Sequence, residues 1–128
     1  METGLRHCEE EIVAPDKTAK NLSSGPVEVY ATPMMVLLME YTCSSCVYPY
    51  LDEGFDTVGT KIDVTHVSAT PVGMKVWCEC ELIEIDRRRL VFSVRAFDEC
   101  GLIGEGTHER FIIDLKKFMD KANEKLQK

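Results

Sequence analysis

The segment from Val29 to Leu51 constrains the fold more than any other part of the sequence. It holds 23 residues and one charged side chain, that of Glu40. Because 29% of the whole chain is charged, a segment of this length would ordinarily carry about six or seven charges. A stretch that is apolar nearly all round is typical of a membrane-spanning helix or of a helix buried in a protein core. A carboxylate in its middle disfavours the membrane, so we expect a central helix enclosed by other elements.

Start and stop signals flank this predicted helix. Thr32 is predicted to be the N-cap, because its hydroxyl can accept a hydrogen bond from a backbone N–H one turn later. Pro33 would then occupy the first helical position, where its missing N–H costs nothing. Pro49 is expected to end the helix, and residues 52–54 begin the exit loop.

Downstream of the helix, apolar residues recur with a period of two, which is typical of strands that bury one face. The predicted strands cover residues 60–67, 74–82, 90–97 and 102–113 and are joined by polar turns. Short runs at 8–13 and 27–30 are further predicted strands, and residues 114–127 read as an amphipathic helix. This order predicts an α+β domain of the hotdog fold, in which an antiparallel sheet wraps one long central helix.

Length and composition limit the classes of function. A chain of 128 residues is expected to form a single domain, residues 1–128. A net charge of −7 argues against non-specific binding to nucleic acid, which needs a basic surface. The sequence shows no membrane-length apolar run and no apolar export signal at its N-terminus, so we expect a cytoplasmic protein without a membrane partner. The six cysteines are then expected to be thiols.

Two side chains are candidates for chemistry. Glu40 would lie within an apolar helix, where a carboxylate loses hydration and its pKa rises unless the group is paired. Such a carboxylate is either a structural hydrogen-bond acceptor or a general base. His66 shares a predicted strand face with Ile62 and Val64, and a histidine on an apolar face is more often a packed core residue than a functional one. The pattern alone leaves both interpretations of each residue open.

The start of the central helix is a third candidate. Free backbone N–H groups and the positive end of the helix dipole at Thr32 suit an oxyanion that develops during a reaction. Together, Thr32, Glu40 and His66 would supply a nucleophile or water-positioning hydroxyl, a general base and its orienting partner. The sequence pattern does not establish that these three side chains meet.

The cysteines suggest a different chemistry, which we consider the weaker one. Cys43 and Cys46 have the spacing of a zinc or redox pair. The second pair, Cys78 and Cys80, has the wrong spacing for a zinc site and falls on inward positions of a predicted strand. Because cysteine is often buried as a small apolar residue, we expect no metal and no cofactor.

Three motifs point to a known family: Thr32-Pro33-Met34-Met35-Val36-Leu37-Leu38-Met39-Glu40, then Gly59-Thr60 with Val64-Thr65-His66, and Gly106-Thr107-His108-Glu109-Arg110. From about Cys8 to Phe118, the chain resembles the fluoroacetyl-CoA thioesterase-like hotdog proteins. The resemblance implies a homodimer, with a dimer of dimers as an open alternative, that hydrolyses acyl-CoA at sites between its subunits. It implies catalytic roles for Thr32, Glu40 and His66, a backbone at Gly59 beside the substrate carbonyl, and a pocket arginine at Arg110.

One segment departs from the family pattern. Fluoroacetate-specific members carry a phenylalanine-bearing lid between the first strand and the threonine, whereas residues 20–30 form a shorter stretch without phenylalanine. A small or short-chain acyl-CoA is therefore the expected substrate class. The alternatives are a non-catalytic module that binds acyl-CoA or an acyl carrier, and a hotdog hydratase, for which the sequence shows no supporting Asp/His motif.

Overall fold

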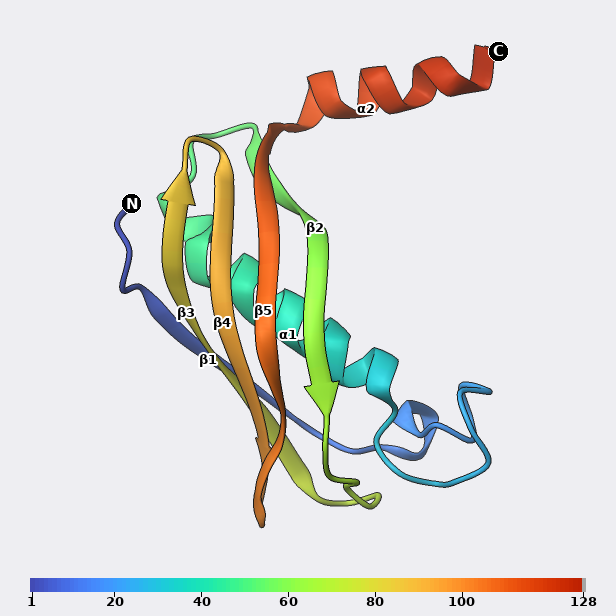
Figure 1. Cartoon of the computed structure of the whole chain (residues 1–128). Helices are drawn as coiled ribbons and strands as arrows, with labels where there is room; N and C mark the ends of the chain where they lie inside the picture. The colour runs from blue at the N-terminus through green and yellow to red at the C-terminus, as the bar shows by residue number, and fades with distance from the viewer. Residues whose placement is uncertain (128) are drawn as a thin grey trace.

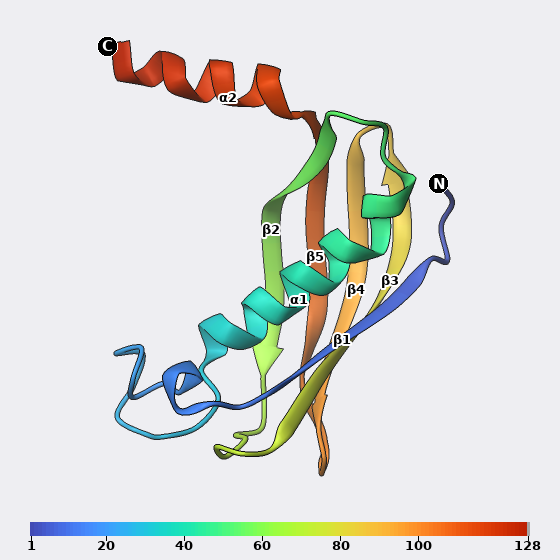
Figure 2. The same cartoon turned by 180° about the vertical axis from the view of Figure 1, so that it is seen from behind.

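The nearly uncharged segment folds into helix α1 (Thr32–Val47), as its composition predicts. In the computed structural model, which describes residues 1–127, α1 lies across one face of a five-stranded sheet (Figure 1, Figure 2). The helix buries seven side chains: Met35, Leu38, Met39, Thr42, Cys43, Cys46 and Val47. Pro49 follows the end of the helix, and the chain turns there through the 3-10 segment η2 (Tyr48–Tyr50). The predicted end of the helix is therefore confirmed.

The predicted N-cap is wrong by one residue. Ala31 is the N-cap, with an extended backbone, and its carbonyl accepts the N–H groups of Met34 and Met35 at 3.0 Å each. Thr32 is already the first helical residue and Pro33 the second. Because a helical backbone no longer points the Thr32 hydroxyl at the N–H groups of the first turn, that hydroxyl is available for a contact outside the helix.

The sheet confirms the predicted hotdog topology. Its strands lie in the order β1-β3-β4-β5-β2, and every pair is antiparallel. They are β1 (Arg6–Ile12), β2 (Phe55–His66), β3 (Lys75–Asp86), β4 (Arg89–Asp98) and β5 (Gly101–Asp114). The strand expected at residues 27–30 is absent, because that segment makes only single bridges, Val29 to Pro71 and Tyr30 to Thr18. Proline has no N–H to donate, so a ladder cannot continue past Pro71.

The C-terminal helix is present but does not pack on its own sheet. Helix α2 (Leu115–Asn123) begins after Asp114, whose side chain accepts the N–H of Lys117, and it continues into the 3-10 turn η3 (Glu124–Gln127). Both views show α2 running away from the end of β5 and past the edge strand β2 (Figure 1, Figure 2). The apolar stripe of α2 stays exposed, with Phe118 at 42%. Within residues 1–127, no helix has the length and apolar character needed to cross a membrane.

A glycine on β5 sets how closely α1 approaches the sheet. A Cβ on Gly104 would lie 2.6 Å from Met35 Sδ on α1 and 2.6 Å from the backbone oxygen of Thr65 on β2. Gly104 also pairs with His66 at the end of β2. The missing side chain therefore lets the start of α1 sit close to the end of β2, where two of the candidate residues lie.

We predict that Gly104→Ala lowers the free energy of unfolding by about 1–3 kcal/mol, since the added methyl overpacks this contact. The matched control is Gly25→Ala, where the new Cβ meets only Ala19 Cβ at 3.8 Å. Urea denaturation of both variants measures the difference. Equal stability of the two variants would contradict the role given to Gly104.

Candidate active site

Thr32 and His66 form a hydrogen-bonded pair. Thr32 Oγ1, at the start of α1, lies 2.7 Å from Nδ1 of His66, the last residue of β2. Burial lowers the pKa of His66, and this effect outweighs the opposing contribution of the Ser68 backbone. A neutral imidazole can accept the proton of the threonine hydroxyl, which is the arrangement of a nucleophile beside its base.

The second ring nitrogen of His66 lacks a partner. Nε2 is buried and makes no hydrogen bond of good geometry within residues 1–127, although the Ser68 backbone lies near the ring. If the Thr32 hydroxyl donates to Nδ1, then Nε2 carries the imidazole proton. Leaving such a donor buried and unpaired costs about 1–3 kcal/mol, so this nitrogen is suited to an acceptor that lies outside the described chain.

Glu40 lies in a second group of residues, between α1 and β2. An open pocket of about 400 Å³ is lined there by Glu40, Leu37, Tyr41, Ser44, Thr57, Val58, Gly59 and Arg110. A Cβ on Gly59 would lie 3.0 Å from Glu40 Oε2, 3.1 Å from His108 Cε1 and 3.4 Å from Arg110 Nη1. A side chain at this position would crowd the carboxylate, the imidazole and the guanidinium, each of which would have to shift by a few tenths of an ångström.

Arg110 is held rigidly at the base of this pocket. Its Nε donates to Thr57 Oγ1 at 2.8 Å, Nη2 donates to the Thr57 carbonyl at 2.9 Å, and Nη1 donates to His108 Nε2 at 3.1 Å. The side chain is buried, with the residue 8% exposed. Burial lowers the pKa of Arg110, and the nearby charge of Glu40 opposes that shift. Since arginine stays protonated in proteins, the pocket contains a fixed positive charge.

His108 belongs to this group, and sequence reasoning assigned it no role. It precedes Arg110 by two residues on β5, so both side chains point to the same face of the strand. The alternation of side chains along β5 could have placed His108 beside Arg110 from the sequence. It does not distinguish a histidine that only packs in the core from one that forms a hydrogen bond to a neighbouring side chain.

One chain does not bring the three predicted catalytic residues together. Thr32 and Glu40 are eight residues apart on α1, which separates them by about 12 Å along the helix axis. The structure therefore contains a Thr32–His66 pair at one end of β2 and a group around Glu40, Gly59 and Arg110 further along the same strand. Any direct contact between Glu40 and His66 requires a second copy of the chain.

The cysteines lie in the core and not in either group. Cys43, Cys46, Cys78 and Cys80 are buried free thiols. Burial raises the pKa of Cys46 and of Cys78 to about 12 in each case, which makes both poor nucleophiles at neutral pH. Among residues 1–127, no group of three or more His, Cys, Asp or Glu side chains is arranged to hold a metal ion.

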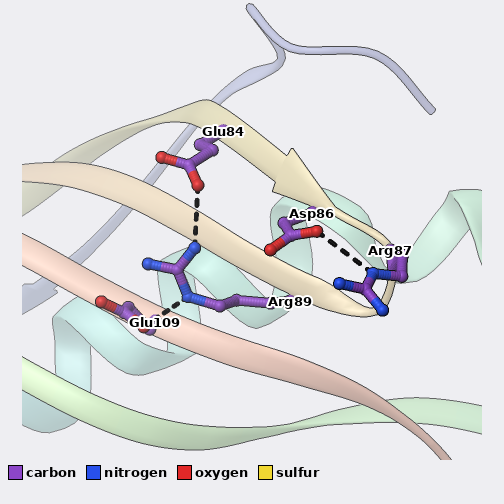
Figure 3. A network of polar contacts seen from close by, with 5 residues as sticks. All are labelled: Glu84, Asp86, Arg87, Arg89 and Glu109. Atoms are coloured by element: carbon purple, nitrogen blue, oxygen red, sulfur yellow. Dashed lines mark hydrogen bonds and ion pairs between the residues drawn. The ribbon is translucent and has the colours of Figure 1, made fainter.

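The arginine-rich turn between β3 and β4 forms a separate cluster. Arg89 donates to Glu109 Oε1 at 2.9 Å and to Glu84 Oε2 at 2.8 Å, so it bridges carboxylates from two strands (Figure 3). Arg87 lies 3.4 Å from Asp86 and is almost fully solvated (Figure 3). The charge of Arg89 is already balanced within the sheet, which favours a solvated hairpin tip over a phosphate site.

Comparisons with known proteins find similar sequences and structures over nearly the whole chain. Residues 13–116 match the family model described as fluoroacetyl-CoA-specific thioesterase. The chain is 42% identical to the fluoroacetyl-CoA thioesterase of Streptantibioticus cattleyicolor over an alignment of 131 residues. This alignment covers 98% of this chain and 94% of that protein. A solved structure of the fluoroacetyl-CoA thioesterase FlK has a TM-score of 0.92 and 42% identity, covering 98% of this chain and 97% of that one. A thioesterase superfamily member from Thermus thermophilus has a TM-score of 0.88 and 29% identity, covering 98% and 96%.

We predict that His66 titrates below the ordinary histidine value of 6.5, because burial disfavours its charged form. The unfolded chain therefore binds the proton of His66 more tightly than the native state does. As a result, the contribution of His66 lowers the free energy of unfolding as the pH falls below 6.5. NMR titration of the imidazole C–H signals, assigned with His66→Gln, measures the midpoint. A midpoint at or above 6.5 would contradict the burial argument.

Proposed function

The chain belongs to the fluoroacetyl-CoA-specific thioesterase family, and we propose that residues 1–128 form one homodimeric domain that hydrolyses small acyl-CoA thioesters with Thr32, Glu40 and His66. The match to the family model and to the curated relative confirms the family resemblance of the sequence motifs and the thioester hydrolase class of the enzyme. The observation that carries the residue assignment is the 2.7 Å contact between Thr32 Oγ1 and His66 Nδ1.

The proposed first step is attack by Thr32. As Oγ1 bonds to the thioester carbonyl carbon, its proton moves to His66 Nδ1. The carbonyl oxygen becomes an oxyanion, which the positive end of the α1 dipole and the backbone at Gly59 of the partner subunit would stabilise. When the tetrahedral intermediate collapses, the C–S bond breaks and His66 gives its proton to the departing sulfur, so that CoA leaves as the thiol and His66 is neutral again. Neutral His66 then takes a proton from a water molecule as its oxygen attacks the acyl-threonine carbonyl, and returns that proton to Thr32 Oγ1 as the ester C–O bond breaks and the free acid leaves.

Glu40 is proposed to orient His66 from the partner subunit. The buried Nε2 of His66 needs an acceptor, and a carboxylate there would hold the imidazole in the tautomer that accepts from Thr32. Within one chain the two residues are too far apart along α1 and β2. We propose the Glu40 carboxylate of a second copy as this acceptor.

The edge strand supports a two-fold dimer. Strand β2 is at the edge of the sheet, so its outer N–H and C=O groups are available to a second β2. Leu37 and Tyr41 beside it on α1 are 53% and 57% exposed. Antiparallel pairing of two β2 strands would place the His66 end of one beside the Gly59 half of the other, and helix α2 projects past the same edge (Figure 1).

The substrate is proposed to be a small or short-chain acyl-CoA. A structure of an FlK variant with fluoroacetate and CoA has a TM-score of 0.87 and 43% identity, covering 92% of this chain and 99% of that one. Because residues 20–30 hold no phenylalanine, we propose no preference for the fluoroacetyl group over acetyl. The free thiols suit a reducing compartment, which supports a cytoplasmic location.

We predict that Thr32→Ala, Glu40→Gln and His66→Ala each lower kcat/KM for thiol release at least about 100-fold, because each removes one member of a proton-transfer unit. Thr65→Ala, on the outward face of β2, is the matched control and should stay near wild type. A panel of acyl-CoA esters with colorimetric thiol detection is the assay. Tight binding of acyl-CoA by calorimetry without thiol release would instead support the non-catalytic alternative.

The nature of the intermediate has its own test. Rapid quenching of wild type with a slow acyl-CoA, followed by mass spectrometry, should find the acyl group on the peptide that contains Thr32. Wild-type turnover without any acylated peptide, together with an active Thr32→Ala variant, would favour direct attack by water.

We predict that mixed dimers of Glu40→Gln and His66→Ala subunits regain activity. Random pairing makes half of the dimers mixed, and each mixed dimer has one intact site, so about a quarter of wild-type activity should return. Subunit exchange followed by the thiol-release assay measures this recovery. If both catalytic residues came from one chain, mixing would restore nothing.

A further inference from the structure

His108 is buried at the centre of the group around Gly59, yet the proposed reaction does not use it. Its residue is 1% exposed, and its ring packs against Phe92 with the centroids 6.5 Å apart. Both ring nitrogens are occupied: Nδ1 lies 2.7 Å from the Lys61 carbonyl and Nε2 lies 3.1 Å from Arg110 Nη1. The imidazole thus connects strand β2 to the pocket arginine.

The two partners fix the protonation of this ring. A backbone carbonyl can only accept, so Nδ1 must carry a proton, and a guanidinium can only donate, so Nε2 must present its lone pair. The neutral Nδ1–H tautomer is the one form that satisfies both contacts. Burial lowers the pKa of His108, and the charge of Arg110 lowers it further, against the Lys61 carbonyl and the charges of Glu40 and Glu109.

The carbonyl that His108 holds follows an irregularity in β2. The register between β2 and β5 shifts between Gly59 and Lys61, so Thr60 is an extra residue in the ladder. Such a bulge changes the direction of the neighbouring main-chain groups. A hydrogen bond to Lys61 directly after the bulge fixes that change, and His108 Cε1 lies 3.1 Å from where a Gly59 Cβ would be.

We propose that His108 is a positioning residue that holds the Gly59 backbone and the Arg110 guanidinium at fixed places in the pocket and thereby determines which acyl groups fit beside Glu40. The inference rests on the proposed thioesterase function and extends it to selectivity among acyl chains. His108 does not touch the reacting atoms; it acts through two neighbours that line the pocket.

Two isosteric variants separate the contacts. Asparagine places an amide N–H near the position of Nδ1, so His108→Asn can keep the bond to Lys61 while Arg110 Nη1 loses its acceptor. Glutamine places an amide oxygen near the position of Nε2, so His108→Gln can keep Arg110 while Lys61 is released. The matched control is His7→Asn, because His7 lies partly exposed on β1 and pairs with Glu9.

The readout is the ratio of kcat/KM for acetyl-CoA to that for butyryl-CoA, with kcat and KM reported separately. We expect each His108 variant to change this ratio about tenfold or more, the size of a lost hydrogen bond to a charged or buried group. His7→Asn should leave it unchanged. A purely structural role for His108 would lower the activity on both esters equally, and that result, or an unchanged ratio, would overturn the proposal.

A second readout does not depend on activity. In ¹⁵N NMR spectra, His108→Gln should shift the Gly59 amide signal, and His108→Asn should shift the Arg110 Nε–H signal. If wild type releases no thiol while these signals move, the proposed function fails and the positioning role remains. If neither signal moves in the folded variants, the positioning role is wrong even where the wild type is active.

Discussion

The close seating of α1 on the sheet is the constraint on which the rest of the structure depends. A helix with one charge in its apolar sequence can be buried by a curved sheet, and Gly104 removes the side chain that would hold the two apart. This contact fixes the start of the helix near the end of β2, where Thr32 meets His66. It also fixes Glu40 in the opening between α1 and β2, where a carboxylate avoids the full cost of burial.

Burial determines the chemistry available to each polar group. His66 and His108 both have lowered pKa values because their rings are desolvated, so both are neutral near neutral pH. For His66 this leaves a base beside a hydroxyl, and for His108 it leaves an acceptor for Arg110. The arginine keeps its charge in the pocket because Thr57 and His108 together satisfy its three kinds of N–H donor.

The sequence pattern predicted the elements whose burial shows along the chain as a continuous apolar run or as alternation. The central helix, the strand faces of β3 and the hotdog topology followed from apolar runs and alternation, since those signals are local. Thr32 was misplaced as the N-cap because capping and His66 compete for one hydroxyl, and a local rule cannot include a partner 34 residues away. The strand expected at 27–30 failed because it had no continuous neighbour to pair with.

The site was harder to predict than the fold. Thr32, Glu40 and His66 were candidates from their sequence context, and the family resemblance added their catalytic roles and the pocket residues Gly59 and Arg110. The arrangement of these residues into two separated groups emerged only from the packing of α1 against β2. His108 was missed because its role depends on a bulge in a neighbouring strand. The exposed stripe of α2 shows the same limit, since periodicity predicts an apolar face but not what covers it.

The most direct test of the central claim is a crystal structure of the protein with a non-hydrolysable acyl-CoA analogue. The account predicts a two-fold dimer in which the carbonyl carbon of the analogue lies next to Thr32 Oγ1. It also predicts that His66 Nε2 donates to Glu40 of the partner subunit, with the acyl group in the pocket that Glu40, Gly59 and Arg110 of the partner subunit line. An analogue bound away from Thr32, or a Glu40 carboxylate remote from every His66 in the assembly, would contradict it.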